Sequence, residues 1–237
     1  MIKLFVGQKG SGKTLQMVKD SQWFFDRGYE VYSNFPAWGW TKEKGIKNIF
    51  KKKKKVQSNF MYAEELEDTL KSTFQKKKPT LFMLDEAPVL FHSRNWQKFD
   101  LDLIYALNQS RKSNVHMFIS AQKYNALDKQ LRETANWVYV CEKKNWGFMK
   151  WFITLVVNPD YFYDEGKSIH LKNYIKKRKI STNWGLQSYY KHYDTEQVVL
   201  PKRLMKKFPE LFPDPATVTI PQIIERASQH EDLNIPI

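Results

Sequence analysis

The residues best suited to chemistry form a glycine-rich segment close to the amino terminus. They are Gly7, Gln8, Lys9, Gly10, Ser11, Gly12, Lys13 and Thr14. They fit the pattern of Gly, four residues, Gly, Lys and Ser or Thr, in which the glycines let the backbone aim several N–H groups at a chain of phosphates. We expect Lys13 to reach the β- and γ-phosphates of ATP and the Thr14 hydroxyl to bind Mg²⁺. The alternative is a turn that matches by chance.

A second candidate is the acid pair Asp85–Glu86, which follows an apolar run at residues 80–84. Such a run is typical of a central strand in a parallel sheet, and ligands bind at the carboxyl edge of such sheets. We expect Asp85 to hold the Mg²⁺ shell, directly or through water, and Glu86 to orient and activate the attacking water. Strands often end in charged residues, so the acid pair alone is weak evidence of a site. The phosphate loop earlier in the same chain is what favours a catalytic role for the pair.

Three further side chains are candidates for the same reaction. Gln122 follows a strand expected at residues 115–120, where it would respond to the γ-phosphate; an ordinary polar strand cap is the alternative. Ring ATPases often use an arginine that reaches the γ-phosphate of a neighbouring subunit. Arg132 is the first candidate for that role and Arg111 the second, although each also suits a cation near a helix end.

The pattern around these residues predicts alternating strands and helices. Residues 2–6 form an apolar, β-prone run before the loop, and Leu15, Val18 and Trp23 follow at helical spacing until Gly28 stops the helix. Further strands are expected at residues 30–35, 80–84, 115–120 and 137–141, and helices at residues 62–74, 100–111 and 127–135. This order predicts an α/β fold with a mainly parallel sheet flanked by helices.

Two basic stretches interrupt this pattern. We expect residues 37–40 to begin an irregular region and the run Lys51–Lys55 to be a solvated loop or tip, because adjacent lysines repel one another. The run would contact nucleic-acid phosphates or serve only solubility. After strands expected at residues 146–157 and 168–175, a basic cluster at residues 176–179 is followed by the aromatic residues Trp184, Tyr189 and Tyr190. These rings would stack on the bases of a single strand or pack on the core of the protein.

The chain divides into three parts. We expect a P-loop ATPase core at residues 1–144, a β-rich extension of the same domain at residues 145–200, and a Pro-rich tail at residues 201–237. With 237 residues the chain is long enough to bury a core.

Composition narrows the class of protein. The net charge of +14 favours a polyanionic partner or an anionic membrane face. A single cysteine, Cys141, excludes an internal disulfide and fits a reducing compartment, and the scattered histidines form no zinc pattern. The longest apolar run, residues 151–157, is far shorter than the roughly 20 residues needed to cross a bilayer. We therefore expect a cytoplasmic protein without a membrane span or signal peptide.

Short motifs follow the phosphate loop in a definite order. They are Val31-Tyr32-Ser33-Asn34, Leu84-Asp85-Glu86-Ala87, Ser110-Arg111, Ile119-Ser120-Ala121-Gln122, Leu131-Arg132 and Tyr193-Asp194-Thr195. This order resembles the zonular occludens toxin family, which includes the assembly ATPases of filamentous phages. That family is similar to the FtsK–HerA class of DNA-pumping ATPases, which includes viral genome-packaging motors. The resemblance covers about residues 1–200.

The resemblance implies a RecA-like sheet, a homo-oligomeric ring that we expect to be a hexamer, and an arginine donated across subunits. Filamentous-phage members carry a membrane-spanning helix after the ATPase domain, which this sequence does not show. The resemblance therefore favours a motor that packages DNA into a capsid in the cytoplasm of an infected bacterium. Capsid or membrane proteins of a virus are the further partners it implies, with peripheral association at the virion or membrane.

The leading hypothesis is an Mg²⁺-dependent ATPase that drives nucleic-acid translocation. One alternative is a phage assembly or extrusion ATPase at the host membrane. Another is a small-molecule kinase on the same loop, which would need neither Glu86 as a hydrolytic base nor a strongly basic surface. A third is an assembly module that binds nucleotide without turnover.

Overall fold

The computed structural model describes residues 1–42, 53–62, 65–76, 78–87, 114–146, 149–161, 175–182, 189 and 192–193. The strands are β1 (Ile2–Val6), β2 (Glu30–Ser33), β3 (Trp38–Lys42), β4 (Lys53–Gln57), β5 (Asn59–Phe60), β6 (Thr80–Leu84), β7 (Val115–Ala121), β8 (Trp137–Trp146), β9 (Met149–Val157) and β10 (Ile175–Thr182). The helices are α1 (Lys13–Asp26), α2 (Leu66–Lys76) and α4 (Lys129–Thr134), with short 3-10 turns η4 (Tyr124–Ala126) and η5 (Pro159–Tyr161). The helix expected at residues 100–111, the strand expected at residues 168–175 (apart from its last residue) and the tail from residue 201 lie outside the described residues.

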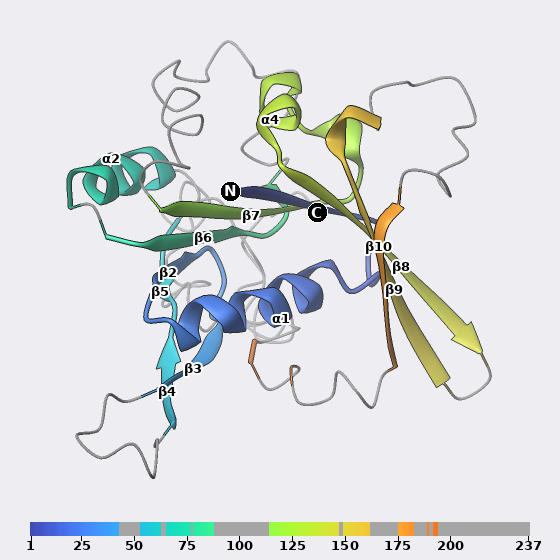
Figure 1. Cartoon of the computed structure of the whole chain (residues 1–237), viewed down its shortest axis with the longest axis horizontal. Helices are drawn as coiled ribbons and strands as arrows, with labels where there is room; N and C mark the ends of the chain where they lie inside the picture. Colours follow the sequence, from blue (N-terminus) through green and yellow to red (C-terminus); the bar gives the residue numbers. More distant parts are fainter. Residues whose placement is uncertain are drawn as a thin grey trace, which may run out of the picture.

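The main sheet has eight strands in the order β10-β9-β8-β1-β7-β6-β2-β5. The six neighbouring strands β8, β1, β7, β6, β2 and β5 pair in parallel (Figure 1). At the other end of the sheet, β9 pairs antiparallel with both β8 and β10. Every residue of β6 is buried, as expected of a central parallel strand. The predicted α/β class, with a mainly parallel sheet and a β-rich end, is confirmed.

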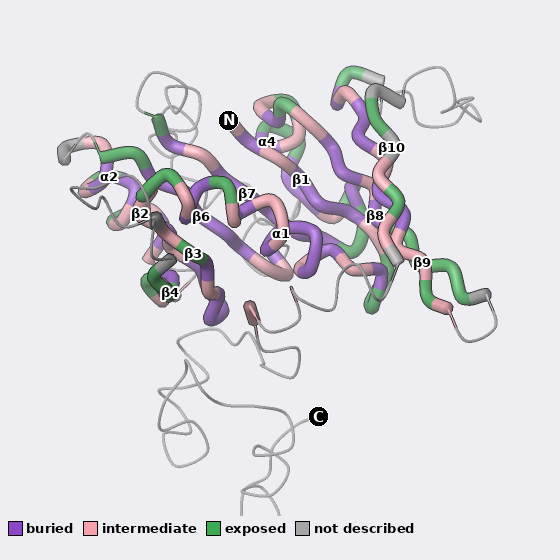
Figure 2. The backbone as a smooth tube through the Cα atoms, turned by 60° about the horizontal axis from the view of Figure 1, so that its bottom comes forward, coloured by how far each residue is buried: buried purple, intermediate pink, exposed green. Residues whose placement is uncertain are grey.

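Helices cover both faces of the sheet: α1 lies on one face, and α2 and α4 lie on the other (Figure 1). Because side chains alternate along a strand, each central strand contributes to two cores. In β1, for example, Phe5 belongs to the same buried cluster as Met17 and Phe25 of α1, whereas Leu4 belongs to the other cluster, with Leu70 of α2 and Leu131 of α4. Figure 2 shows the resulting buried centre and the exposed ends of the β8–β9 hairpin. The two cores fix the carboxyl ends of the parallel strands at one edge.

The prediction of an irregular region and a lysine loop after β2 was wrong where the structure describes it. Strands β3 and β4 form an antiparallel ribbon, with Trp38 opposite Gln57. The reason is a tertiary contact: a Cβ on Gly39 would lie 2.1 Å from the Phe25 side chain, so the ribbon rests directly on α1. Solvation of the lysine run holds for Lys54 and Lys55, which are exposed.

The carboxyl-terminal strands also differ from the prediction. The strand expected at residues 146–157 is divided between the end of β8 and β9, and the basic cluster at residues 176–179 lies within the edge strand β10. Charged residues suit a strand at the edge of a sheet. Elsewhere the element boundaries move by a few residues: β2 ends earlier than expected, α2 begins later, and β8 extends further. None of the helices that the structure describes is long and apolar enough to cross a membrane.

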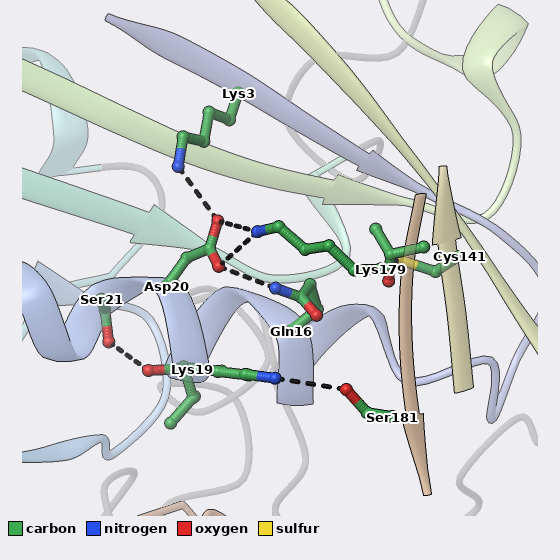
Figure 3. A network of polar contacts seen from close by, with 10 residues as sticks. Lys3, Gln16, Lys19, Asp20, Ser21, Cys141, Lys179 and Ser181 are labelled. Carbon is green, nitrogen blue, oxygen red and sulfur yellow. Dashed lines mark hydrogen bonds and ion pairs between the residues drawn. The ribbon is translucent and has the colours of Figure 1, made fainter. Parts of the chain in front are cut away.

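A largely buried ionic cluster ties α1 to the inner strand β1 and to the edge strand β10 (Figure 3). Asp20 of α1 accepts hydrogen bonds from Lys3 of β1 at 3.0 Å and from Lys179 of β10 at 3.1 Å. The Asp20 side chain is only 11% exposed. Burial alone would raise the pKa of Asp20, but the two lysines outweigh that effect and lower the pKa. A second contact, from Lys19 to Ser181 at 3.2 Å, also joins α1 to β10.

Replacing Asp20 by asparagine should destabilise the protein, because Lys3 and Lys179 would lose their countercharge in a buried place. The free energy of unfolding at pH 7 should fall by about 3 kcal/mol. Because the pKa of Asp20 is lowered on folding, its stabilisation is complete above the unfolded pKa of about 3.9 and is lost as the pH falls through the folded value. Urea denaturation measures the change.

The matched control is Glu67→Gln, which breaks the exposed pair between Glu67 and Lys71. That change should cost less than about 1 kcal/mol. Equal losses in Asp20→Asn and Glu67→Gln would contradict a structural role for the buried cluster.

Candidate nucleotide-binding site

The phosphate loop joins β1 to α1, as predicted, and its glycines are needed for two physical reasons. At Gly7 the backbone passes so close to β8 that a Cβ would lie 2.2 Å from the carbonyl oxygen of Cys141. Gly12 adopts a left-handed conformation with φ of 88° immediately before the first residue of α1. Gly12 has no side chain to cap this helix, so the first-turn N–H groups are free to bind an anion.

Two polar side chains of the loop are buried beside these N–H groups. Lys13 is only 5% exposed, and its Nζ donates to the Gln8 carbonyl at 3.2 Å, so the ammonium is folded over the loop. Ser11 is 6% exposed, and its Oγ has no hydrogen-bond partner among the described residues. A buried donor without a partner costs free energy. A bound phosphate group would satisfy it, so the loop fits such a ligand.

The Asp85 carboxylate is held on both of its oxygens. Thr14 Oγ1 donates to Asp85 Oδ2 at 2.8 Å, and Ser120 Oγ donates to Asp85 Oδ1. Hydroxyl and carboxylate oxygens are hard ligands, and Mg²⁺ commonly takes one or two protein oxygens together with phosphate oxygens and water. In the described part of the chain, no three His, Cys, Asp or Glu residues cluster to hold a metal alone. The donor set therefore fits Mg²⁺ bound together with a nucleotide.

Asn34, at the end of β2, positions Asp85 through its backbone. The Asn34 amide donates to the Asp85 carbonyl at 2.9 Å and accepts from the Asp85 N–H at 2.8 Å. No role was predicted for Asn34 or Ser120 from the sequence. One signal was available: both residues stand at the carboxyl ends of strands, where parallel strands bring side chains to a common edge.

Glu86 and Gln122 lie at the same edge. Glu86 has a φ of 49°, a left-handed conformation that is uncommon for a residue other than glycine, and its N–H donates to Ser120 Oγ at 3.0 Å. The Gln122 amide nitrogen lies 3.4 Å from each carboxylate oxygen of Glu86, which is long for a hydrogen bond. The structure thus brings the loop, Thr14, Asp85, Glu86 and Gln122 together.

Of the two candidate arginines only Arg132 is described, and it is not part of this group. Arg132 lies on α4, where it donates to Asn125 Oδ1 at 3.1 Å and lies 5.1 Å from the centre of the Tyr124 ring. Arg111 lies outside the described residues. Action of either arginine on a neighbouring subunit stays a prediction.

Replacing Asn34 by alanine should weaken binding of Mg²⁺ with ATP by about tenfold or more, because the Asp85 backbone loses its two hydrogen bonds with the Asn34 amide. Binding of ATP in the presence of EDTA should change much less. Isothermal titration calorimetry with and without Mg²⁺ measures both, with Asn125→Ala as the control. Equal losses with and without Mg²⁺ would show that Asn34 does not act through Asp85.

The fold is that of a P-loop NTPase, and it is similar to solved structures. One is the N-terminal domain of zonular occludens toxin from Neisseria meningitidis, with a TM-score of 0.51 and 18% identity over 81% of this chain and 98% of that chain. Another is the genome packaging NTPase B204 from Sulfolobus turreted icosahedral virus 2 in complex with ATP-gammaS, with a TM-score of 0.45 and 13% identity over 76% and 95% of the two chains. No curated protein matches the sequence.

The sequence itself matches one protein family. The profile of the family described as zonular occludens toxin (Zot) matches residues 1–197, a range that contains the phosphate loop, the acid pair and β10. The resemblance inferred from the order of the motifs is confirmed. The chain therefore belongs to the zonular occludens toxin (Zot) family.

Proposed function

We propose that the protein is an Mg²⁺-dependent ATP hydrolase that drives the movement of nucleic acid. One observation carries the hydrolase part: the Thr14 hydroxyl of the phosphate loop is hydrogen-bonded to Asp85, and Glu86 follows it at the same edge of the sheet. A loop that binds phosphates, a metal-binding pair and an adjacent carboxylate are the parts that ATP hydrolysis needs.

Each residue has a distinct role in this proposal. The loop N–H groups and Lys13 bind the phosphates, for which the lysine exchanges its contact with the Gln8 carbonyl. Thr14 and Asp85 would hold Mg²⁺, which would offset the negative charge of the phosphates. Asn34 keeps Asp85 in place.

Glu86 orients a water molecule for attack on the γ-phosphorus and accepts its proton, while the bond from the γ-phosphorus to the departing ADP oxygen breaks. The Gln122 amide stands next to the Glu86 carboxylate, so loss of the γ-phosphate would change its position. Lys13 and an arginine of a neighbouring subunit, Arg132 or Arg111, offset the charge that develops on the phosphate.

The nucleic-acid part rests on charge and on the family. The net charge is +14, and lysines are exposed on the β3–β4 ribbon and on the antiparallel strands: Lys54, Lys55, Lys143, Lys144, Lys150 and Lys177. Phosphate contacts of this kind dominate the affinity of proteins for nucleic acids. In its finer form the proposal is a homohexameric ring that packages viral DNA into a capsid. Extrusion of phage DNA at the host membrane would use the same motor.

Steady-state ATP hydrolysis with and without single- and double-stranded DNA tests the proposal. DNA should stimulate turnover by the unmodified protein. Glu86→Gln should keep ATP binding but lower kcat by about 10²–10⁴-fold, because the water loses its base. Lys13→Ala should lose both binding and turnover, and Glu133→Gln, an exposed glutamate on α4, should behave like the unmodified protein.

Two results would contradict the proposed function and indicate a different one. Phosphoryl transfer to a small acceptor, indifferent to DNA, would indicate a kinase. Tight ATP binding without turnover, even with DNA present, would indicate an assembly module.

A further inference from the structure

One face of the β3–β4 ribbon is turned away from α1. Trp40 lies opposite Lys55 and Trp38 lies opposite Gln57, so these four residues share a face of the ribbon. The other face contains Gly39, whose Cα lies against the Phe25 ring of α1. Figure 1 shows the ribbon extending beyond α1 at the lower left.

This outer face combines an exposed indole with a cation. Trp40 is 42% exposed, although tryptophan is usually well buried. Lys55 is exposed, and its Nζ lies 5.2 Å from the centre of the Trp38 ring. The described part of the ribbon ends with Lys42 opposite Lys53, so its far end is rich in cationic residues.

The ribbon is firmly anchored at its base. The Trp38 carbonyl accepts from Gln22 of α1 at 3.0 Å and lies 2.8 Å from His192 Nδ1. The Trp38 N–H donates to the His192 carbonyl at 2.8 Å, and the rings of Trp40 and His192 lie 6.4 Å apart. The two indoles therefore stand on a fixed strand, which lowers the entropy lost when a ligand binds.

An exposed aromatic ring beside lysines is suited to binding single-stranded nucleic acid. Unpaired bases offer a free face for stacking, whereas the bases of a duplex are already stacked on one another. Lysine side chains contact the phosphates of either form. The aromatic ring, not the charge, thus distinguishes single strands from duplexes.

We propose that this ribbon face binds single-stranded DNA, with Trp40 stacked on an unpaired base and Lys55 on a phosphate. This inference rests on the proposed nucleic-acid motor and names the strand form that it contacts. The ribbon itself lies against α1, the helix that begins at the phosphate loop, so the proposed DNA contact is joined to that loop by a single helix.

Fluorescence anisotropy of a dye-labelled oligothymidylate of about 20 nucleotides, compared with a duplex of equal length, tests the inference. The unmodified protein should bind the single strand more tightly. Trp40→Ala should weaken single-strand binding about tenfold without changing its salt dependence. Lys55→Gln should reduce the slope of log K against log salt by about 0.7, the value for one phosphate contact.

Two matched controls carry the same chemistry elsewhere. Trp23→Ala removes an indole that is 48% exposed on α1 and stacked with Arg27, and Lys129→Gln removes an exposed lysine on α4. Both should bind DNA like the unmodified protein. Circular dichroism and ATP binding should confirm that every variant is folded.

The outcomes separate this inference from the proposed function. If Trp40→Ala binds the single strand as tightly as Trp23→Ala does, or if the unmodified protein prefers the duplex, the ribbon assignment is wrong while a DNA-stimulated ATPase remains. If the unmodified protein binds neither form of DNA, both the inference and the nucleic-acid function fail.

Discussion

The nucleotide-binding site depends on the Asp85 carboxylate being held in one position. Its oxygens accept from Thr14 and Ser120, and its backbone is held by Asn34, so three separate segments meet at one residue. Thr14 and Asp85 are 71 positions apart in the chain. Only a parallel sheet, in which the carboxyl ends of β2, β6 and β7 share an edge with the loop after β1, brings them within hydrogen-bond distance.

Helix α1 is the element that relates this edge to the rest of the protein. It begins at Gly12 in the phosphate loop, binds β1 and β10 through Asp20, and supports the ribbon through Phe25. The buried charges of Lys3, Asp20 and Lys179 need one another, because none could be buried alone at low cost. As a result, the basic strand β10 and the β3–β4 ribbon are both attached to the helix that follows the phosphate loop.

The central strands and the positions of the phosphate loop and the acid pair could be predicted from the sequence because their signals are local. Apolar runs at residues 2–6 and 80–84 predict β1 and β6, and the loop pattern predicts its own conformation. The β3–β4 ribbon could not be predicted, because it depends on a contact between Gly39 and Phe25. The hydrophobic pattern of the sequence does not indicate such a tertiary contact. Asn34 was missed for a similar reason: nothing local distinguishes an amide that binds the backbone of a distant strand from one that caps its own strand.

The most direct test of this account is a crystal structure of the protein with Mg²⁺ and a non-hydrolysable ATP analogue. In that structure the phosphates should lie on the loop and Lys13 Nζ should leave the Gln8 carbonyl for a phosphate oxygen. Thr14 and Asp85 should hold Mg²⁺, directly or through water, in place of their hydrogen bond to each other. A nucleotide bound away from the loop would contradict this account. So would Mg²⁺ held elsewhere while Thr14 and Asp85 remain hydrogen-bonded to each other.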